Sequence, residues 1–175
     1  METQAQISKP EPVVESDIEA FIPDFYIESD SERLDLYRRI YRVANEDELS
    51  SIRVELQDRF GEYPEEVENL LQLVSLRFLA SQTGFQKLSL KGEMFTILLP
   101  DSSNEMFYEK DGDTDAPFQK IMSLVSQSND KNVQLNNKGR ELTLEFSRLL
   151  TGDAKRRLDS EKNKLAELTS SLLNS

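Results

Sequence analysis

The 175-residue sequence contains no cysteine and no histidine. Without cysteine there is no disulfide and no thiol chemistry. Without histidine the chain lacks the commonest general base and the commonest zinc ligand. Paired carboxylates are the remaining catalytic option, but the adjacent Glu65 and Glu66 point in different directions on a helix. We therefore expect no catalytic residue, no metal site and no cofactor, and we predict that this chain is not an enzyme.

Long hydrophobic runs are also missing. No stretch approaches the roughly 18 consecutive apolar residues that cross a membrane. The first residues show neither the basic region nor the apolar run of a signal peptide. We expect a soluble, cytoplasmic protein with no membrane partner.

Basic residues are scarce: 21 Lys and Arg face 33 Asp and Glu, which gives a net charge of −12. Residues 1–35 alone hold ten acids and two bases. Binding to a phosphate backbone needs clustered Lys and Arg, and the one basic cluster, Lys155–Arg157, is flanked by acids. We expect no direct nucleic-acid ligand. The acidic excess favours a basic protein surface as partner.

Two further patterns carry no ligand chemistry. The alternating acids of Asp111–Asp115 begin like a calcium loop, but Ala116 and Met122 stand where such a loop needs Gly and Glu. The six glycines never fall in the spacing of a phosphate-binding loop. We interpret residues 111–115 as a solvated acidic loop.

The sequence divides into a tail and one domain. Residues 1–16 are polar, contain Pro10 and Pro12, and predict a flexible linker. Residues 17–175 predict a single domain. Within it, Pro23 prevents a continuous helix over 18–27, so we expect an irregular segment there whose aromatic residues, Phe21 and Phe25 among them, pack on the core.

Three helices are predicted over residues 30–84. The first begins near Asp30 or Ser31, either of which is a good N-cap, and runs to about Ala44. Its three- and four-residue apolar spacing puts one stripe in the core: Leu34, Tyr37, Ile40, Tyr41 and Ala44. The second begins at Asn45, which forms a capping box with Glu48, and ends at Gly61 as an αL stop. The third has Pro64 in its first turn and ends at Gly84.

The periodicity then changes. Residues 86–99 and the segment around "NNKG" predict two β-hairpins, with an amphipathic helix from Pro117 between them. A terminal helix follows Gly152. The fold class is therefore α/β (α+β), with a helical part at about 30–84 and a mixed strand and helix part at about 85–175.

One corner of the helical part stands out. If the apolar stripe of the second helix faces the core, Glu55, Asp58 and Arg59 lie on its flank or outside, and Glu62 extends the charge around the turn. We call these four residues the acidic corner. Such a rim suits arginine from another protein. The pattern fits an inert solvated face equally well.

The order of motifs adds to this reading. An Ile-Pro-x-x-Tyr-Ile segment at 22–27 precedes "RLDLYRR" at 33–39, and "ELQDRFG" at 55–61 precedes Pro64. Over about residues 13–90 this resembles the C-terminal domain of bacterial transcription-repair coupling factors, the Mfd translocases. Residues 1–12 then resemble the end of a linker, and the chain a piece of a longer protein.

The resemblance implies a role in transcription-coupled nucleotide excision repair. In that family the full-length protein displaces stalled RNA polymerase by ATP-driven translocation on DNA, and recruits UvrA through an N-terminal UvrB-like module. The resemblance implies that the C-terminal domain is regulatory: it docks on the UvrB-like module of its own chain and masks the UvrA-binding surface. Glu55 and Asp58 would then pair with arginines of that module, while UvrA and RNA polymerase are indirect partners.

An alternative remains open. The acidic corner could instead recruit an external partner, as a structural or recruitment module. Binding that persists when the parent protein opens would favour recruitment, whereas binding lost on opening would favour autoinhibition.

Overall fold

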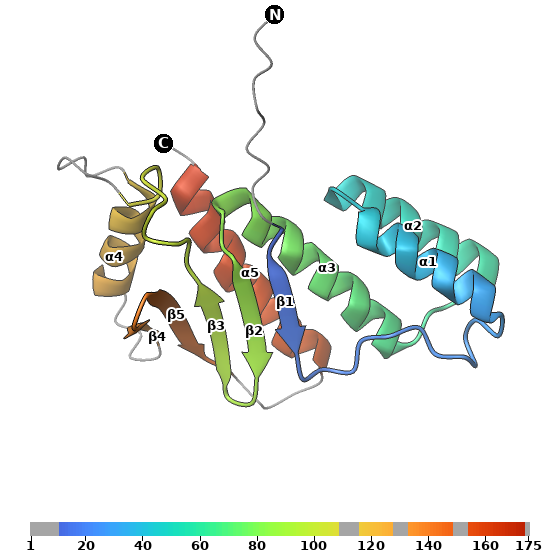
Figure 1. The fold of residues 1–175 in the computed structure, drawn as a ribbon. Coiled ribbons are helices and arrows are strands. Elements are labelled where there is room, and N and C mark those ends of the chain that lie inside the picture. Colours follow the sequence, from blue (N-terminus) through green and yellow to red (C-terminus); the bar gives the residue numbers. More distant parts are fainter. Residues whose placement is uncertain (1–10, 109–115, 128–132, 149–153, 174–175) are drawn as a thin grey trace, which may run out of the picture.

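The computed structural model describes residues 11–108, 116–127, 133–148 and 154–173 of the chain (Figure 1). These described residues form five helices and five strands. They are β1 (Val13–Ser16), α1 (Asp30–Arg42), α2 (Glu46–Phe60), α3 (Glu65–Thr83), β2 (Lys87–Lys91), β3 (Met94–Leu98), α4 (Pro117–Gln127), β4 (Val133–Lys138), β5 (Glu141–Ser147) and α5 (Ala154–Leu173).

The five strands form one sheet in the order β1-β2-β3-β5-β4. The two predicted hairpins, β2–β3 and β4–β5, are confirmed, and β3 pairs antiparallel with β5. β1 runs parallel to β2 at one edge. The prediction of a linker through residue 16 was wrong for Val13–Ser16, because the open edge of β2 and the ion pair of Glu15 with Lys87, at 2.8 Å, come from residues far away in the sequence.

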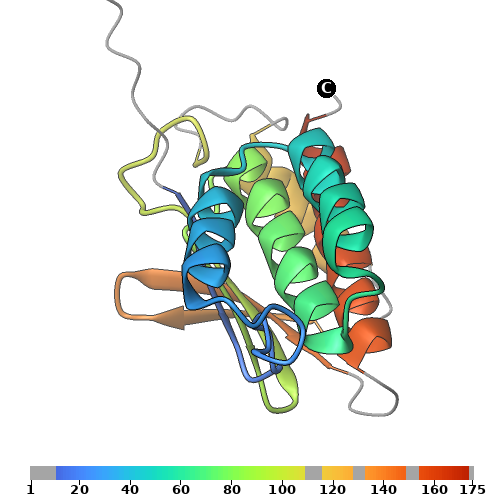
Figure 2. The ribbon, with the colours of Figure 1, turned by 90° about the vertical axis from the view of Figure 1, so that its right-hand side faces the viewer.

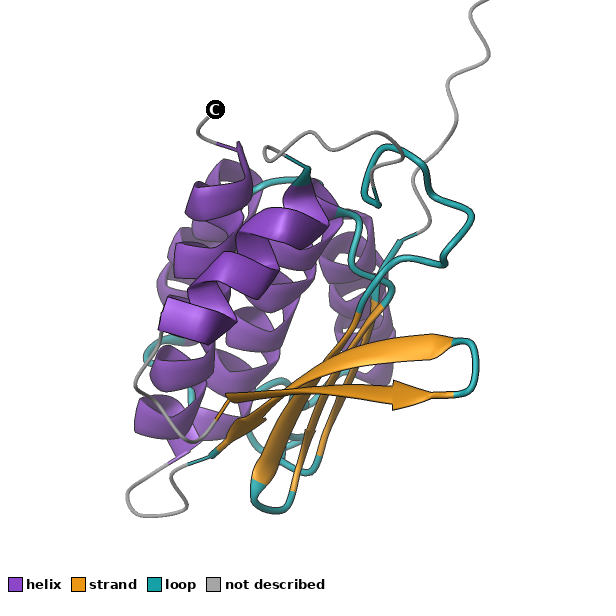
Figure 3. Ribbon diagram, turned by 90° about the vertical axis from the view of Figure 1, so that its left-hand side faces the viewer, coloured by secondary structure: helices purple, strands orange, loops and turns teal. Residues whose placement is uncertain are grey.

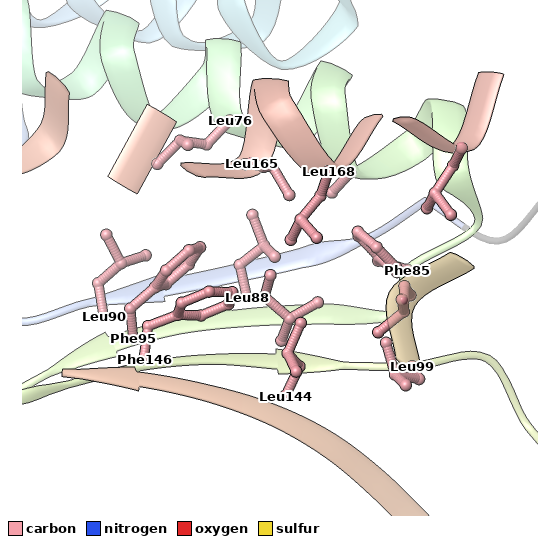
Figure 4. Packing of buried hydrophobic residues seen from close by; sticks show 14 of the residues in the cluster. Leu76, Phe85, Leu88, Leu90, Phe95, Leu99, Leu144, Phe146, Leu165 and Leu168 are labelled. Carbon is pink, nitrogen blue, oxygen red and sulfur yellow. The ribbon is translucent and has the colours of Figure 1, made fainter. Parts of the chain in front are cut away.

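The main core lies between the sheet and two helices. α3 and α5 pack on one face of the sheet (Figures 1 and 3). Leu76, Leu165 and Leu168 point from these helices toward a layer of strand residues (Figure 4). That layer includes Leu88, Leu90, Phe95, Leu144 and Phe146. The predicted mixed α/β (α+β) class is confirmed.

A second core lies on the other side of α3, where α1 and α2 pack against it (Figure 2). Its fully buried residues include Leu49, Leu56, Val67 and Leu71. α3 therefore has two covered sides, which explains why it also buries the polar residues Asn69, Gln72 and Ser75.

The observed helix ends lie close to the predicted ones, with small differences. Ser29, one residue before the predicted caps, accepts the Glu32 N–H at the start of α1. Asn45 accepts the Glu48 N–H at 2.9 Å, so the predicted cap of α2 is confirmed. Gly61 ends α2 with φ 81° and ψ −165°, a conformation open to glycine but not the αL stop that we predicted.

Several aromatic and apolar residues lie further out than predicted. α1 buries Leu36 and Ile40, and turns Leu34 and Tyr41 to solvent, 50% and 69% exposed. Ile40 and the half-buried Tyr37 keep their predicted side, and Ala44, after the end of α1, is exposed. Because α1 packs on α3 through Leu36 and Ile40, its contact stripe is rotated by about a quarter of a turn from the predicted one. Phe21 and Phe25 are also exposed, and their placement in the core was wrong.

Some predicted features fall outside what the structure describes. These are the loop Asp111–Asp115 and the side chains of Lys155–Arg157. In the described ranges, no helix is long and apolar enough to cross a membrane. The same ranges contain no group of acidic side chains placed to hold a metal ion.

Candidate docking surface

The four residues of the acidic corner lie along the last turns of α2 and just beyond it. Glu55 is half-buried, and Asp58, Arg59 and Glu62 are exposed. α2 presents them because its buried positions, Leu49, Ile52 and Leu56, face α3. The structure thus brings the predicted residues to one end of the helical part, and it gives them different surroundings.

Glu55 is already paired within the chain. It accepts hydrogen bonds from Arg39 Nη1 at 2.8 Å, from Arg39 Nη2, and from Arg59 Nη1 at 2.9 Å. These bonds, from Arg39 first and then Arg59, lower the pKa of the Glu55 carboxyl to about 2. The bidentate contact in turn raises the pKa of Arg39. Glu55 is thus a charged group held in place by α1.

Arg59 extends this network back to α1. Its Nη2 donates to Glu32 Oε1 at 2.9 Å, and its guanidinium lies over the Phe60 ring at 4.7 Å from the centroid. Charges therefore alternate in the order Glu32, Arg59, Glu55, Arg39 between the two helices. We call these four residues the corner network. Sequence reasoning missed Glu32 and Arg39, because the partners are 16 or more residues apart on another helix.

A shallow hollow of about 290 Å³ lies between α1 and α2 at this network. Apolar atoms form its floor and charged groups its rim. The floor and rim residues are Ile27, Glu32, Asp35, Leu36, Arg39, Glu55, Leu56, Arg59 and Phe60. The rim carries three carboxylates and two guanidiniums, so it keeps one negative charge.

Asp58 and Glu62 differ from Glu55. Among the described residues neither has an ion-pair partner, and both side chains reach solvent. Asp58 lies in the last turn of α2, where the helix dipole disfavours a negative charge. These two carboxylates are therefore available to a partner.

The turn that follows Pro23 contacts the end of α2 at the acidic corner. Tyr26 Oη donates to the carbonyl oxygens of Leu56 and Gly61, each at 3.1 Å. The Tyr26 ring packs edge-on against Phe60, with centroids 5.9 Å apart. The end of α2 is consequently fixed to the segment that leads into α1.

A second ionic cluster lies where β1 and β5 end beside α5. The Arg148 side chain is fully buried; its Nε donates to Glu161 Oε1 at 3.2 Å, and its Nη1 donates to Asp17 Oδ1 and to the Gly92 carbonyl, both at 3.1 Å. We call Asp17, Arg148 and Glu161 the buried lock. It joins the residue after β1 to the end of β5 and to α5, and its buried position gives it a structural role.

Known proteins resemble this chain in sequence and in fold. The family model described as the TRCF domain matches residues 16–109. The transcription-repair-coupling factor of Staphylococcus epidermidis is 32% identical over 127 residues, 72% of this chain and 11% of that protein. The corresponding factor of Helicobacter pylori is 41% identical over 88 residues, 50% of this chain and 9% of that protein.

The fold has a solved counterpart. A crystal structure of the C-terminal domain of a transcription-repair coupling factor superposes with a TM-score of 0.70 at 22% identity, covering 93% of this chain and 96% of that one. The chain spans about a tenth of the length of the curated relatives it matches. The chain belongs to the TRCF domain family, the C-terminal domain of transcription-repair coupling factors.

Proposed function

We propose that this domain is the regulatory, non-catalytic end of an Mfd-type protein, and that it docks on the UvrB-like module of its own chain. Docking through the acidic corner masks the surface on which UvrA binds. The resting protein is thereby kept from recruiting excision repair until the parent protein engages RNA polymerase.

The observation that carries this proposal is the position of Asp58. An unpaired carboxylate in the last turn of α2 opposes the helix dipole and so lowers the stability of the isolated domain. Residues that break a local rule of stability are expected at functional sites. Partner arginines facing Asp58 and Glu62 would offset that cost.

The corner network holds the docking surface in a fixed shape. Because Glu55 is held by Arg39 and Arg59, its main part is to fix these guanidiniums and the end of α2, while Asp58 and Glu62 meet the partner. A preorganised surface loses little conformational entropy when it binds.

A small interface is enough to keep this domain docked on the UvrB-like module. The two partners belong to one polypeptide, and a linker of ordinary length gives a high effective concentration. A weak, charge-based contact then stays closed at rest. Engagement of RNA polymerase shifts the population to the open state by favouring it.

The test uses the full-length parent protein carrying Asp58→Lys and Glu62→Lys together. We expect the doubly reversed protein to capture UvrA in a pull-down far better than the resting wild type. Glu141→Lys, a reversal of an exposed acid at the β4–β5 hairpin, is the matched control and should leave capture unchanged. Unchanged capture by the doubly reversed protein would exclude masking through this corner.

The same experiment separates recruitment of an external partner. In that case charge reversal would abolish binding of the external protein, and UvrA capture would stay at its resting level.

A further inference from the structure

Two phenylalanines at the acidic corner are exposed although the rest of their kind is not. Phe21 is 43% exposed and Phe25 is 72% exposed. The other seven phenylalanines of the chain are buried or half-buried. Two large aromatic side chains within a five-residue segment are therefore exposed to solvent, and packing within this domain does not explain their exposure.

The backbone beneath them is fixed. Ile22, between the two phenylalanines, and Ile27, two residues after Phe25, are almost fully buried. The N–H groups of Tyr26 and Ile27 both donate to the Pro23 carbonyl at 3.2 Å, and the Ile22 N–H donates to the Tyr37 hydroxyl at 2.7 Å. The two rings are thus presented by a rigid turn, which is how binding surfaces hold aromatic anchors at low entropic cost.

Their position coincides with the docking surface. The Phe21 N–H donates to the Glu66 carbonyl at 3.2 Å, which places residue 21 at the first turn of α3. Tyr26, the neighbour of Phe25, bonds the Gly61 carbonyl at the end of α2. The segment from β1 accordingly passes beneath the ends of α1 and α3 where the corner lies (Figure 2).

The arginines of the corner network are paired with carboxylates, whereas the unpaired charges around the two rings are negative. Asp24, Glu62 and Glu65 are exposed, and the described part of the chain provides none of them with an ion-pair partner. An apolar centre within a charged rim is the usual anatomy of a protein interface. A second copy of this chain would bring acid against acid, and anionic lipid or nucleic acid would be repelled in the same way.

We propose that Phe21 and Phe25 are the apolar anchor of this surface, and that they enter a recess on a protein surface bordered by basic residues. This inference rests on the proposed function and adds the contact that supplies affinity, whereas the carboxylates supply orientation and partner choice. It predicts that docking survives moderate salt, since burial of aromatic surface is not screened.

The experiment compares three variants of the full-length parent protein: Phe21→Ala with Phe25→Ala, Asp58→Lys with Glu62→Lys, and Met106→Ala. Met106, 91% exposed beside the opposite end of α3, is the matched apolar control. We expect the variant with Phe21→Ala and Phe25→Ala to raise the fraction of open protein by about tenfold or more. That fraction is measured as UvrA capture at low protein concentration. The Met106 variant should behave as wild type.

The outcomes are distinguishable. If the charge variant raises capture and the phenylalanine variant does not, the anchor is wrong and the proposed function stands. If neither raises capture, the proposed function fails. Thermal unfolding of this chain supplies a second readout: the phenylalanine variant should keep the midpoint of the wild type, and a marked drop would mean that the rings are structural.

Discussion

Two clusters of arginine and carboxylate occur in this domain, and they differ in burial. The corner network joins α1 to α2 with side chains that are about one third to one half exposed. The buried lock joins residue 17 to β5 and α5 through an arginine with no exposed side-chain surface. The chemistry is the same and only the access of water differs.

That difference separates a cluster that can lose a partner from one that cannot. In water, loss of one arginine–carboxylate pair costs little, so the corner network tolerates the removal of a partner. In the buried lock, removing a single partner leaves a charge with no water to solvate it. Within the described residues, Arg148 Nη2 and Glu161 Oε2 already lack a hydrogen-bond partner, so the lock has one unpaired donor and one unpaired acceptor even when all its members are present.

The largest expected effect is from Arg148→Ala. It strands the buried Glu161 carboxylate and removes the ion pair of Asp17 with the end of β5. We expect the free energy of unfolding to fall by about 3–5 kcal/mol, measured by urea denaturation of this chain. A loss below about 1 kcal/mol would place the lock in the same class as a surface pair.

A paired replacement sharpens the same point. Arg148→Met with Glu161→Leu removes both buried charges and keeps apolar volume. We expect the double variant to be within about 1 kcal/mol of the wild type, or more stable, because the desolvation of two charges is removed with their attraction. A double variant as unstable as Arg148→Ala would mean that the hydrogen bonds to Asp17 and Gly92 matter more than the charge.

The next effect concerns the backbone under the corner. Gly61 has φ 81° and ψ −165°, a region that residues with a side chain avoid, although open space surrounds the position of a Cβ. Gly61→Ala should therefore cost about 1–3 kcal/mol through strain alone, again by urea denaturation. Gly84→Ala is the control: at φ 77° and ψ 14° it occupies the αL region, and we expect a smaller loss. Equal losses would contradict the assignment of strain to the ψ of Gly61.

Features set by nearby residues could be predicted from the sequence, whereas features set by distant residues could not. Helices, hairpins and the cap at Asn45 were predictable because hydrogen bonds and apolar spacing within a few residues determine them. β1 was missed because this four-residue strand is stabilised by pairing with β2, more than 70 residues later in the sequence. The corner residues were found as an acidic flank, whereas their pairing with Arg39 and Glu32 depends on how two helices cross.

The next prediction concerns pH. The pKa of Glu55 is about 2 in the folded protein, below its ordinary value of 4.5. Its pairing therefore stabilises the fold above about pH 4.5, and this contribution is lost as the pH falls toward about 2. Glu55→Gln should cost at most about 1 kcal/mol at pH 7, as surface pairs do, and the two proteins should converge in stability as the pH falls through this window. Parallel curves of unfolding free energy against pH would show that Glu55 titrates normally.

The smallest expected effect has the opposite sign. Asp58→Asn removes an unpaired negative charge from the last turn of α2, so it should stabilise this chain by about 0.3–1 kcal/mol at low salt, and by less as salt screens the dipole. Asp47→Asn, in the first turn of the same helix, should instead destabilise. Thermal unfolding at two salt concentrations measures both. A stabilised domain that docks less well in its parent protein would show that Asp58 is kept for binding at a cost to the fold. Destabilisation by Asp58→Asn would mean that this carboxylate supports the corner network, and would leave Glu62 and the exposed phenylalanines as the only docking residues among those proposed.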